Sequence, residues 1–198
     1  MRMHLKKAPL EGAHIRLEPV SESHRDAMRA MVEGDPDAWS ILLTNGQGEA
    51  FGDYFATMCG PSADPHRIAF ALKRLSDGAI VGTTSFYDIA PRHGTVEIGG
   101  TYYRPDARGG IVNPEAKYLL LAHAFGNGAL RVQLRTDARN ARSQAAIEKL
   151  GAKKEGVIRR QFITWNGHHR DSVIYSIIAE EWPEVKAGLE RRLSTFTG

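Results

Sequence analysis

The sequence predicts a single domain of mixed α/β class, with a twisted, largely antiparallel sheet and helices on both faces. Three observations support this fold class. Short β-rich runs follow one another across hairpin turns such as Ser76-Asp77-Gly78. Helical stripes separate the other strands, and one helical crossover joins the strands of Glu97 and Val132. The length of 198 residues suits one domain, 1–198, with disorder expected at most over residues 1–9.

Caps, turns and apolar alternation locate the elements of the first half. Ser21 is a typical N-cap, Gly34 and Pro36 end the helix that follows it, and the Gly-containing stretch 44–48 is a loop. The expected elements are a strand over 14–20, helices over 21–32, 37–43 and 49–58, and strands over 67–75, 79–87 and 95–103.

The second half is organised around the stretch from Glu97 to Phe125, which is expected to form a strand, a Gly-containing loop and a helix. Asn113 is placed as the N-cap of that helix, with Pro114 at its first position. Apolar residues at 118, 121, 122 and 125 recur with helical spacing and should pack onto the sheet. The elements expected after it are a strand over 131–136, a helix over 140–150 capped by Asn140, strands over 156–164 and 170–178, and a helix over 180–193.

Composition and charge exclude several classes of protein. The chain is 42% apolar and 25% charged and has no apolar run long enough to cross a membrane. Its net charge of +3 is dispersed, which disfavours nucleic-acid binding. The single Cys59 allows no intramolecular disulfide and, with no secretory signal, favours the cytoplasm. His168 and His169 would point to opposite faces of a strand, so no metal site is expected.

The loop before the central helix has features of an anion site. Gly109 and Gly110 carry no side-chain bulk, so their amides can approach a ligand closely. A helix N-terminus directly behind such a loop gathers unpaired N–H groups and a positive dipole end, which suit a phosphate. The alternative is an ordinary strand-to-helix turn.

Several short motifs along the chain point to one family. They are Glu97-Ile98-Gly99, Asn113-Pro114-Glu115-Ala116-Lys117, Asn140-x-x-Ser143, Ile147-Glu148-Lys149-Leu150-Gly151-Ala152, Glu155-Gly156, Arg170-Asp171 and Glu181-Trp182. Together they resemble the GNAT acyl-CoA-dependent N-acetyltransferases, most closely the branch that modifies ribosomal-protein N-termini. The resemblance covers about residues 10–193, and the family's order of elements matches the one expected here.

The resemblance implies acetyl-CoA as co-substrate. Backbone amides at the loop would hold its pyrophosphate, and the edge of the preceding strand would pair with its pantetheine arm. Asn140 and Ser143 resemble the family's polar contacts to that arm, the alternatives being a helix cap and a surface hydroxyl. The implied cofactor-binding residues are Gly100, Thr101, Tyr102, Arg108, Gly109, Gly110, Ile111, Val112, Asn113, Asn140 and Ser143.

Three positions depart from the family pattern. Ile111 stands where the second glycine of the pyrophosphate loop is expected, which predicts weaker cofactor binding or a rearranged loop. Ile147 replaces a tyrosine that serves as acid in many relatives, and Phe162 falls where relatives place a carboxylate.

Glu97 is the predicted catalytic base, acting through a water, because it is a charged residue on an otherwise apolar strand that leads into the loop. Ser143 is the second predicted catalytic residue and would protonate the leaving thiolate or orient the thioester. The alternatives are an outward-facing Glu97 paired with Arg or Lys, and catalysis by positioning of the substrates alone.

The expected function is acetyl transfer to a primary amine, directly within a ternary complex. A peptide N-terminus, an aminoglycoside-like amine, a polyamine and an amino acid all stay open as acceptors. A peptide N-terminus or a small amine is ranked above a polycationic acceptor, because the acceptor wall has no acidic cluster. That wall is expected to comprise residues 39–48, Phe86, Tyr87 and the turn over 162–169. The rival is a catalytically silent GNAT-like CoA-binding or regulatory module. The oligomeric state stays open, a homodimer included.

Overall fold

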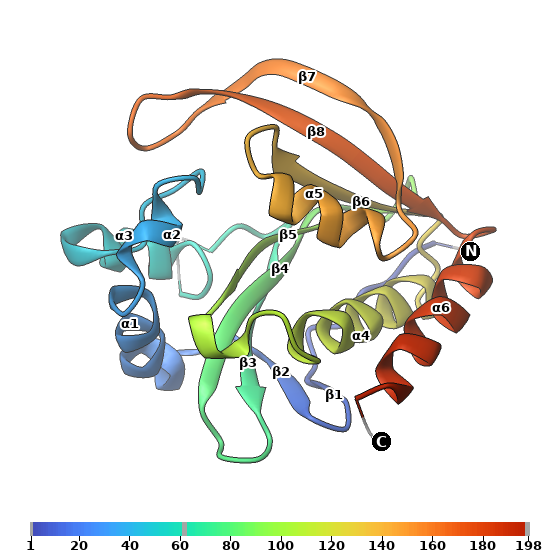
Figure 1. Cartoon of the computed structure of the whole chain (residues 1–198), viewed down its shortest axis with the longest axis horizontal. Helices are drawn as coiled ribbons and strands as arrows, with labels where there is room; N and C mark the ends of the chain where they lie inside the picture. The colour runs from blue at the N-terminus through green and yellow to red at the C-terminus, as the bar shows by residue number, and fades with distance from the viewer. Residues whose placement is uncertain (1, 61–62, 197–198) are drawn as a thin grey trace.

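An eight-stranded sheet organises the computed structural model, which describes residues 2–60 and 63–196 (Figure 1). The strands lie in the order β1-β2-β3-β4-β5-β6-β8-β7, and β5 and β6 are the parallel pair. Their bounds are β1 Leu10–Glu11, β2 Ile15–Pro19, β3 Ile68–Arg74, β4 Ile80–Ala90, β5 Thr95–Tyr103, β6 Arg131–Asp137, β7 Lys153–Ile163 and β8 His169–Ile178. The helices are α1 Arg25–Glu33, α2 Pro36–Trp39, α3 Phe51–Ala56, α4 Val112–Gly126, α5 Ala141–Glu148 and α6 Trp182–Ser194.

The two faces of the sheet carry separate apolar cores. On β3, Phe70 and Leu72 pack into the main core under α4 and α6, whereas the alternate residues Ala69 and Ala71 pack under α1 to α3. In Figure 1, α4 and α6 lie beside each other, away from α1 to α3. The predicted fold class, with helices on both faces, is confirmed.

Local signals placed two helix starts correctly. Ser21 caps the 3₁₀ turn Glu22–His24 that leads into α1, and it forms a capping box with His24, whose ring Nδ1 accepts the Ser21 N–H at 3.1 Å. Asn140 caps α5, since its side-chain oxygen accepts the Ser143 N–H at 2.9 Å. Both caps satisfy an N–H group that the helical hydrogen-bond pattern leaves without a partner.

Three expectations about helices were wrong. The helix expected over 37–43 ends at Trp39. The central helix begins at Val112 rather than after Asn113, because Ile111 already has helical backbone angles; Asn113 accepts the Tyr103 hydroxyl at 3.0 Å instead of capping. The stripe beginning at Tyr118 packs only partly on the sheet: Leu121 is buried in the main core, whereas the rings of Tyr118 and Phe125 contact Trp182 of α6.

The strands β5 and β6 diverge at the middle of the sheet. Their parallel pairing runs from Thr95 opposite Arg131 to Ile98 opposite Leu134 and then stops. Beyond that point β5 continues along β4, and β6 continues along β8 to Asp137. The divergence leaves the inner edges of residues 99–103 and 135–137 without a strand partner.

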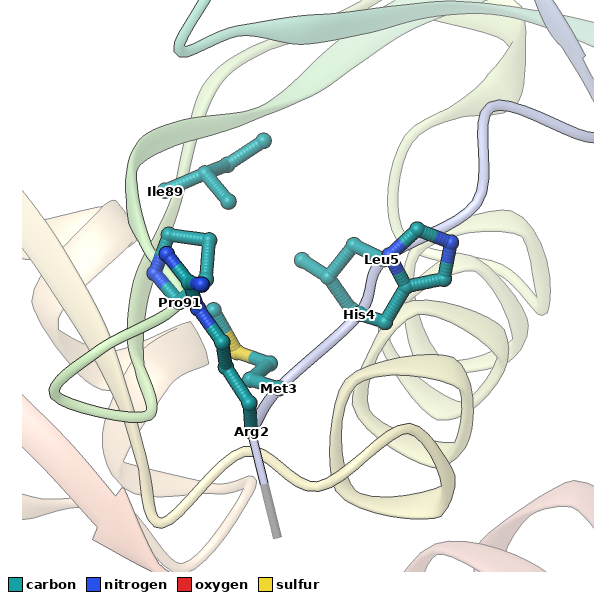
Figure 2. A pocket seen from close by; sticks show the side chains of 6 residues that line it. All are labelled: Arg2, Met3, His4, Leu5, Ile89 and Pro91. Atoms are coloured by element: carbon teal, nitrogen blue, oxygen red, sulfur yellow. The ribbon is translucent and has the colours of Figure 1, made fainter.

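The N-terminal segment packs along the domain without forming a helix or strand before Leu10. Met3 is buried in the main core, and the His4 N–H donates to the Asn127 carbonyl at 3.0 Å. A surface hollow of about 420 Å³ lies between this segment and the end of β4 (Figure 2). Residues Arg2, Met3, His4, Leu5, Ile89 and Pro91 line it. Within the described ranges, no helix is long and apolar enough to cross a bilayer.

Candidate active site

The first turn of α4 begins directly after the Gly-containing loop and has no side-chain cap. Gly109 has a φ of 77°, and a Cβ at Gly109 or Gly110 would meet nothing within 4 Å, so the loop is open to a ligand. Ile111 has an ordinary helical φ of −71°, so the family departure at this position introduces no backbone strain. The open amides and the helix start fit a phosphate.

Arg108 is engaged with the protein rather than free to face a ligand. Its N–H donates to the Pro105 carbonyl at 3.2 Å within a 3₁₀ turn. Its guanidinium donates to the Tyr103 carbonyl at 2.8 Å and forms an ion pair with Asp35. The Arg108 N–H is therefore not available to an anion, and the candidate amides are those of the loop and helix start after it, from Gly109 on.

The free edge of β5 is irregular where the strands diverge. Gly100 has a φ of 56°, and the register against β4 shifts between Thr83 and Ser85. Thr101 accepts a hydrogen bond from the buried Lys117 Nζ at 2.8 Å, and burial lowers the pKa of Lys117 to about 7. The Tyr102 side chain points away into the second core, so only its backbone lies at the edge.

The two polar residues predicted to contact the pantetheine arm differ in their present contacts. The Asn140 oxygen is occupied as the α5 cap, which is the alternative foreseen for it. The Ser143 hydroxyl makes no hydrogen bond to any residue in 2–60 or 63–196 and is free to contact a ligand. In the part of the chain that the structure describes, no hydrogen bond links Ser143 to Glu97.

Glu97 lies on the α1 to α3 side of β5, since its neighbours Val96 and Ile98 pack in the main core. The residue is only 5% exposed. Gln133 Nε2 donates to Oε2 at 2.8 Å, and an Arg135 terminal nitrogen donates to Oε1 at 3.0 Å. Burial raises the pKa of the Glu97 carboxyl above its usual value, although Arg135 acts in the opposite direction.

Glu97 thus combines the predicted role and its alternative: it is a buried carboxylate beside the diverging strands, and it is paired with an arginine. Tyr87 lies opposite Glu97 on β4, and a Cβ at Gly100 would come within 2.5 Å of the Tyr87 hydroxyl, so this ring covers the bulge. The Arg135 guanidinium lies 5.0 Å from the centre of the Phe162 ring.

Phe86 was wrongly included in the acceptor wall. It is fully buried in the main core, on the opposite face to Glu97, because neighbouring residues on a strand alternate between faces. Trp39 is also buried, against the rings of Tyr54 and Tyr102. Of the predicted aromatic wall, Tyr87 and Phe162 remain near Glu97.

The turn between β7 and β8 closes onto the segment that follows α1. The Trp165 ring N–H donates to the Trp39 carbonyl at 2.9 Å, and its backbone N–H donates to the Leu43 carbonyl at 3.1 Å. Asn166 donates to the Ser40 carbonyl at 3.0 Å. In Figure 1 this hairpin extends across the molecule toward α2, so the two predicted parts of the acceptor wall meet.

Sequence reasoning missed two arginines of this region, Arg135 and Arg170. The signal for Arg135 was present, because Arg131, Gln133 and Arg135 alternate with the apolar Val132 and Leu134, which is the pattern of a strand with one polar face. Arg170 was quoted only as part of a family motif. Its position beside Phe162 follows from the β7–β8 pairing.

The comparisons with known proteins decide the family. The sequence matches the acetyltransferase (GNAT) domain over residues 14–153. The chain belongs to the GNAT acetyltransferase family. As a GNAT protein it is an N-acetyltransferase, and the predicted family, enzyme class and fold are confirmed.

Relatives and solved structures agree with this assignment. YoaA of Bacillus subtilis (strain 168), described as an uncharacterized N-acetyltransferase, is 29% identical over 173 residues, which are 81% of this chain and 97% of YoaA. A GCN5-related N-acetyltransferase from Brucella melitensis has a TM-score of 0.89 and 25% identity over 97% of this chain and 88% of that one. Mycobacterium smegmatis RimJ in complex with CoA-disulfide shares the fold, with a TM-score of 0.77 and 19% identity over 93% and 92% of the two chains.

Proposed function

We propose that this GNAT enzyme transfers the acetyl group of acetyl-CoA to a primary amine, directly within a ternary complex. The observation that carries the proposal is the divergence of β5 from β6 after Ile98, with the buried Glu97 at that point. Direct transfer needs both substrates side by side, and the opening between the diverging strands has an unpaired strand edge on each of its two sides.

The residues present fit acetyl-CoA. The uncapped start of α4 and the open Gly109 and Gly110 suit a pyrophosphate, and the unpaired edge at 99–103 can pair with an extended pantetheine arm. When bound, acetyl-CoA supplies an activated acyl thioester. The free hydroxyl of Ser143 would contact that arm or the thioester. Its contribution to catalysis would be smaller than that of Glu97, because a hydroxyl gives up its proton poorly.

Glu97 would accept the proton of the acceptor ammonium through a water. An amine attacks only when unprotonated, and the raised pKa of Glu97 makes it a better proton acceptor than an exposed carboxylate. Arg135 and Gln133 hold the carboxylate in a single orientation. In the reaction the amine nitrogen gains the acetyl group, the carbon–sulfur bond breaks, and the thiolate takes up a proton.

The acceptor is ranked as a peptide N-terminus or a small amine, ahead of a polycation. Arg67, Arg135 and Arg170 lie on or beside the Glu97 face, which would repel a polycationic acceptor. A cytoplasmic setting and a homodimer stay predictions from the sequence.

Calorimetry with CoA and a CoA-release assay on a panel of amines test this function. We expect saturable heat with CoA and thiol release that depends on an amine. Absence of both heat and a thermal shift at millimolar CoA, a concentration that detects even weak binding, would contradict the CoA site and favour a catalytically silent regulatory module. Binding without release for any amine in a broad panel would contradict transfer to an amine.

A further inference from the structure

Arg170 is a buried cation without a counter-charge. Its residue is 9% exposed, and its Nε is buried and makes no hydrogen bond. Across the described ranges, 2–60 and 63–196, no carboxylate lies within ion-pair distance of its guanidinium. Burying a guanidinium with unmet donors is unfavourable, so these donors call for an acceptor group from outside the chain.

The neighbouring charges are already neutralised in pairs. Glu97 pairs with Arg135 at 2.9 Å, and Asp137 pairs with Arg139 at 2.8 Å. Arg170 is within electrostatic range of all four of these groups and is left as the one uncompensated charge among them. A single additional anion would balance the group.

Arg170 also lies on the same face of the sheet as the proposed base. The Phe162 ring is 5.0 Å from the Arg135 guanidinium and 6.0 Å from that of Arg170, so one ring separates the arginine that holds Glu97 from the unpaired one. Ser172, two residues along the same face of β8, has a buried hydroxyl that also lacks a partner. Two unsatisfied polar groups therefore lie two residues apart on one face of β8, and Arg170 is the one paired with Phe162.

We propose that Arg170 binds a carboxylate of the acceptor, so that the substrate class is a small amino carboxylate such as an amino acid. This inference rests on the proposed acetyl transfer to an amine. An amino carboxylate carries one ammonium and one carboxylate, which match the proton-accepting Glu97 and the unpaired Arg170. The planar fork of a guanidinium suits a carboxylate, and a monoanion is sufficient for one unpaired cation.

The test compares acceptors that differ only in the carboxylate. Glycine, β-alanine, γ-aminobutyrate, methionine and phenylalanine are each assayed against their amides by CoA release, with rates corrected for the fraction of unprotonated amine. For at least one pair we expect kcat/KM to be tenfold or more higher for the carboxylate. Arg170→Gln should reduce that preference to near one, mainly through KM. Arg159→Gln, an exposed arginine on β7, should keep it.

A second measurement separates binding from a structural role. Because Arg170→Gln removes an unpaired buried charge, its melting temperature should equal or exceed that of the wild type. A lower melting temperature, or an unchanged carboxylate preference in the variant, would overturn the inference. Equal use of acids and amides by the wild type would overturn it while leaving amine acetylation intact, whereas no turnover with any amine would overturn the proposed function itself.

Discussion

The two faces of the central strands differ in how their side chains are satisfied. On the α4 side, Val96, Ile98 and Leu134 pack into a continuous apolar core. On the other side, the carboxylate of Glu97 is buried and pairs with the partly buried guanidinium of Arg135. The same backbone thus carries an apolar face that stabilises the fold and a polar face whose burial is unfavourable without partners.

This difference indicates where function lies. Buried charges that are unpaired or have shifted pKa values gather at functional sites, because proton transfer and substrate binding need them there. The apolar face also contains the buried charged residues Glu115 and Lys117 on α4. Substitutions distinguish the groups that stabilise the fold from those whose burial is unfavourable.

Leu134→Ala should have the largest effect on stability. Leu134 is 2% exposed in the main core, and removing such a side chain costs about 2–5 kcal/mol through lost burial and the cavity left behind. Leu130→Ala is the matched control, because Leu130 is 62% exposed and should change stability by less than about 0.5 kcal/mol. Urea unfolding measures both; equal losses would contradict the assignment of the core face.

Glu115→Ala should have the next largest effect on stability. The Glu115 carboxylate accepts the backbone N–H groups of Ala13 at 2.7 Å, His14 at 3.1 Å and Ile15 at 3.0 Å, and so ties β2 to α4. Leaving these donors without an acceptor should cost about 1–3 kcal/mol in the free energy of unfolding. Glu180→Ala, at an exposed position, serves as control. If Glu115→Ala loses no more stability than this control, water replaces the carboxylate as the acceptor of these N–H groups.

Lys117→Met should stabilise the protein. In the unfolded chain Lys117 titrates near 10.5, whereas burial lowers its pKa to about 7 in the fold, so between these values the unfolded state binds more protons. The contribution of this group to stability is therefore present above pH 10.5 and is lost as pH falls toward 7. The variant should gain at least about 1 kcal/mol at pH 6 and a smaller amount at pH 10.

Melting curves at both pH values measure this difference, with the exposed Lys154→Met as control. A gain that is the same at pH 6 and pH 10 would contradict the buried neutral lysine. A loss of stability at both would show that the Lys117 hydrogen bond to Thr101 outweighs its burial.

Local patterns predicted much of the fold but little of the site. The β5 bounds, Thr95–Tyr103, and the Asn140 cap were predicted as observed, because alternation and capping depend on neighbours in sequence. The α4 start was placed too late, since Asn113 and Pro114 suit the first turn as well as the cap. Local signals of this kind do not distinguish adjacent positions.

The charged partners at the site were not predictable, because they depend on the order of strands in the sheet. Glu97 meets Arg135 only because β6 adds beside β5, and Arg170 meets Phe162 only through the β7–β8 pairing. Glu97 itself was found because its charge interrupts an apolar strand. Its pairing and burial are facts of tertiary structure.

The most direct test of the account is the pH–rate profile of Glu97→Gln against wild type, with the amine that the acceptor panel selects. Turnover should fall about a hundredfold or more, because the variant keeps the shape and loses the proton acceptor. In the wild type, the rate should fall as the pH drops through the raised pKa of the Glu97 carboxyl. This acidic limb of the pH–rate profile should be absent from the variant.

Glu155→Gln is the matched control, since Glu155 also pairs with a β6 arginine, Arg131, but lies away from the diverging strands and is largely exposed. It should retain turnover within about twofold. If Glu97→Gln keeps near-full turnover with an unmoved acidic limb, Glu97 is structural and the enzyme works by positioning its substrates alone.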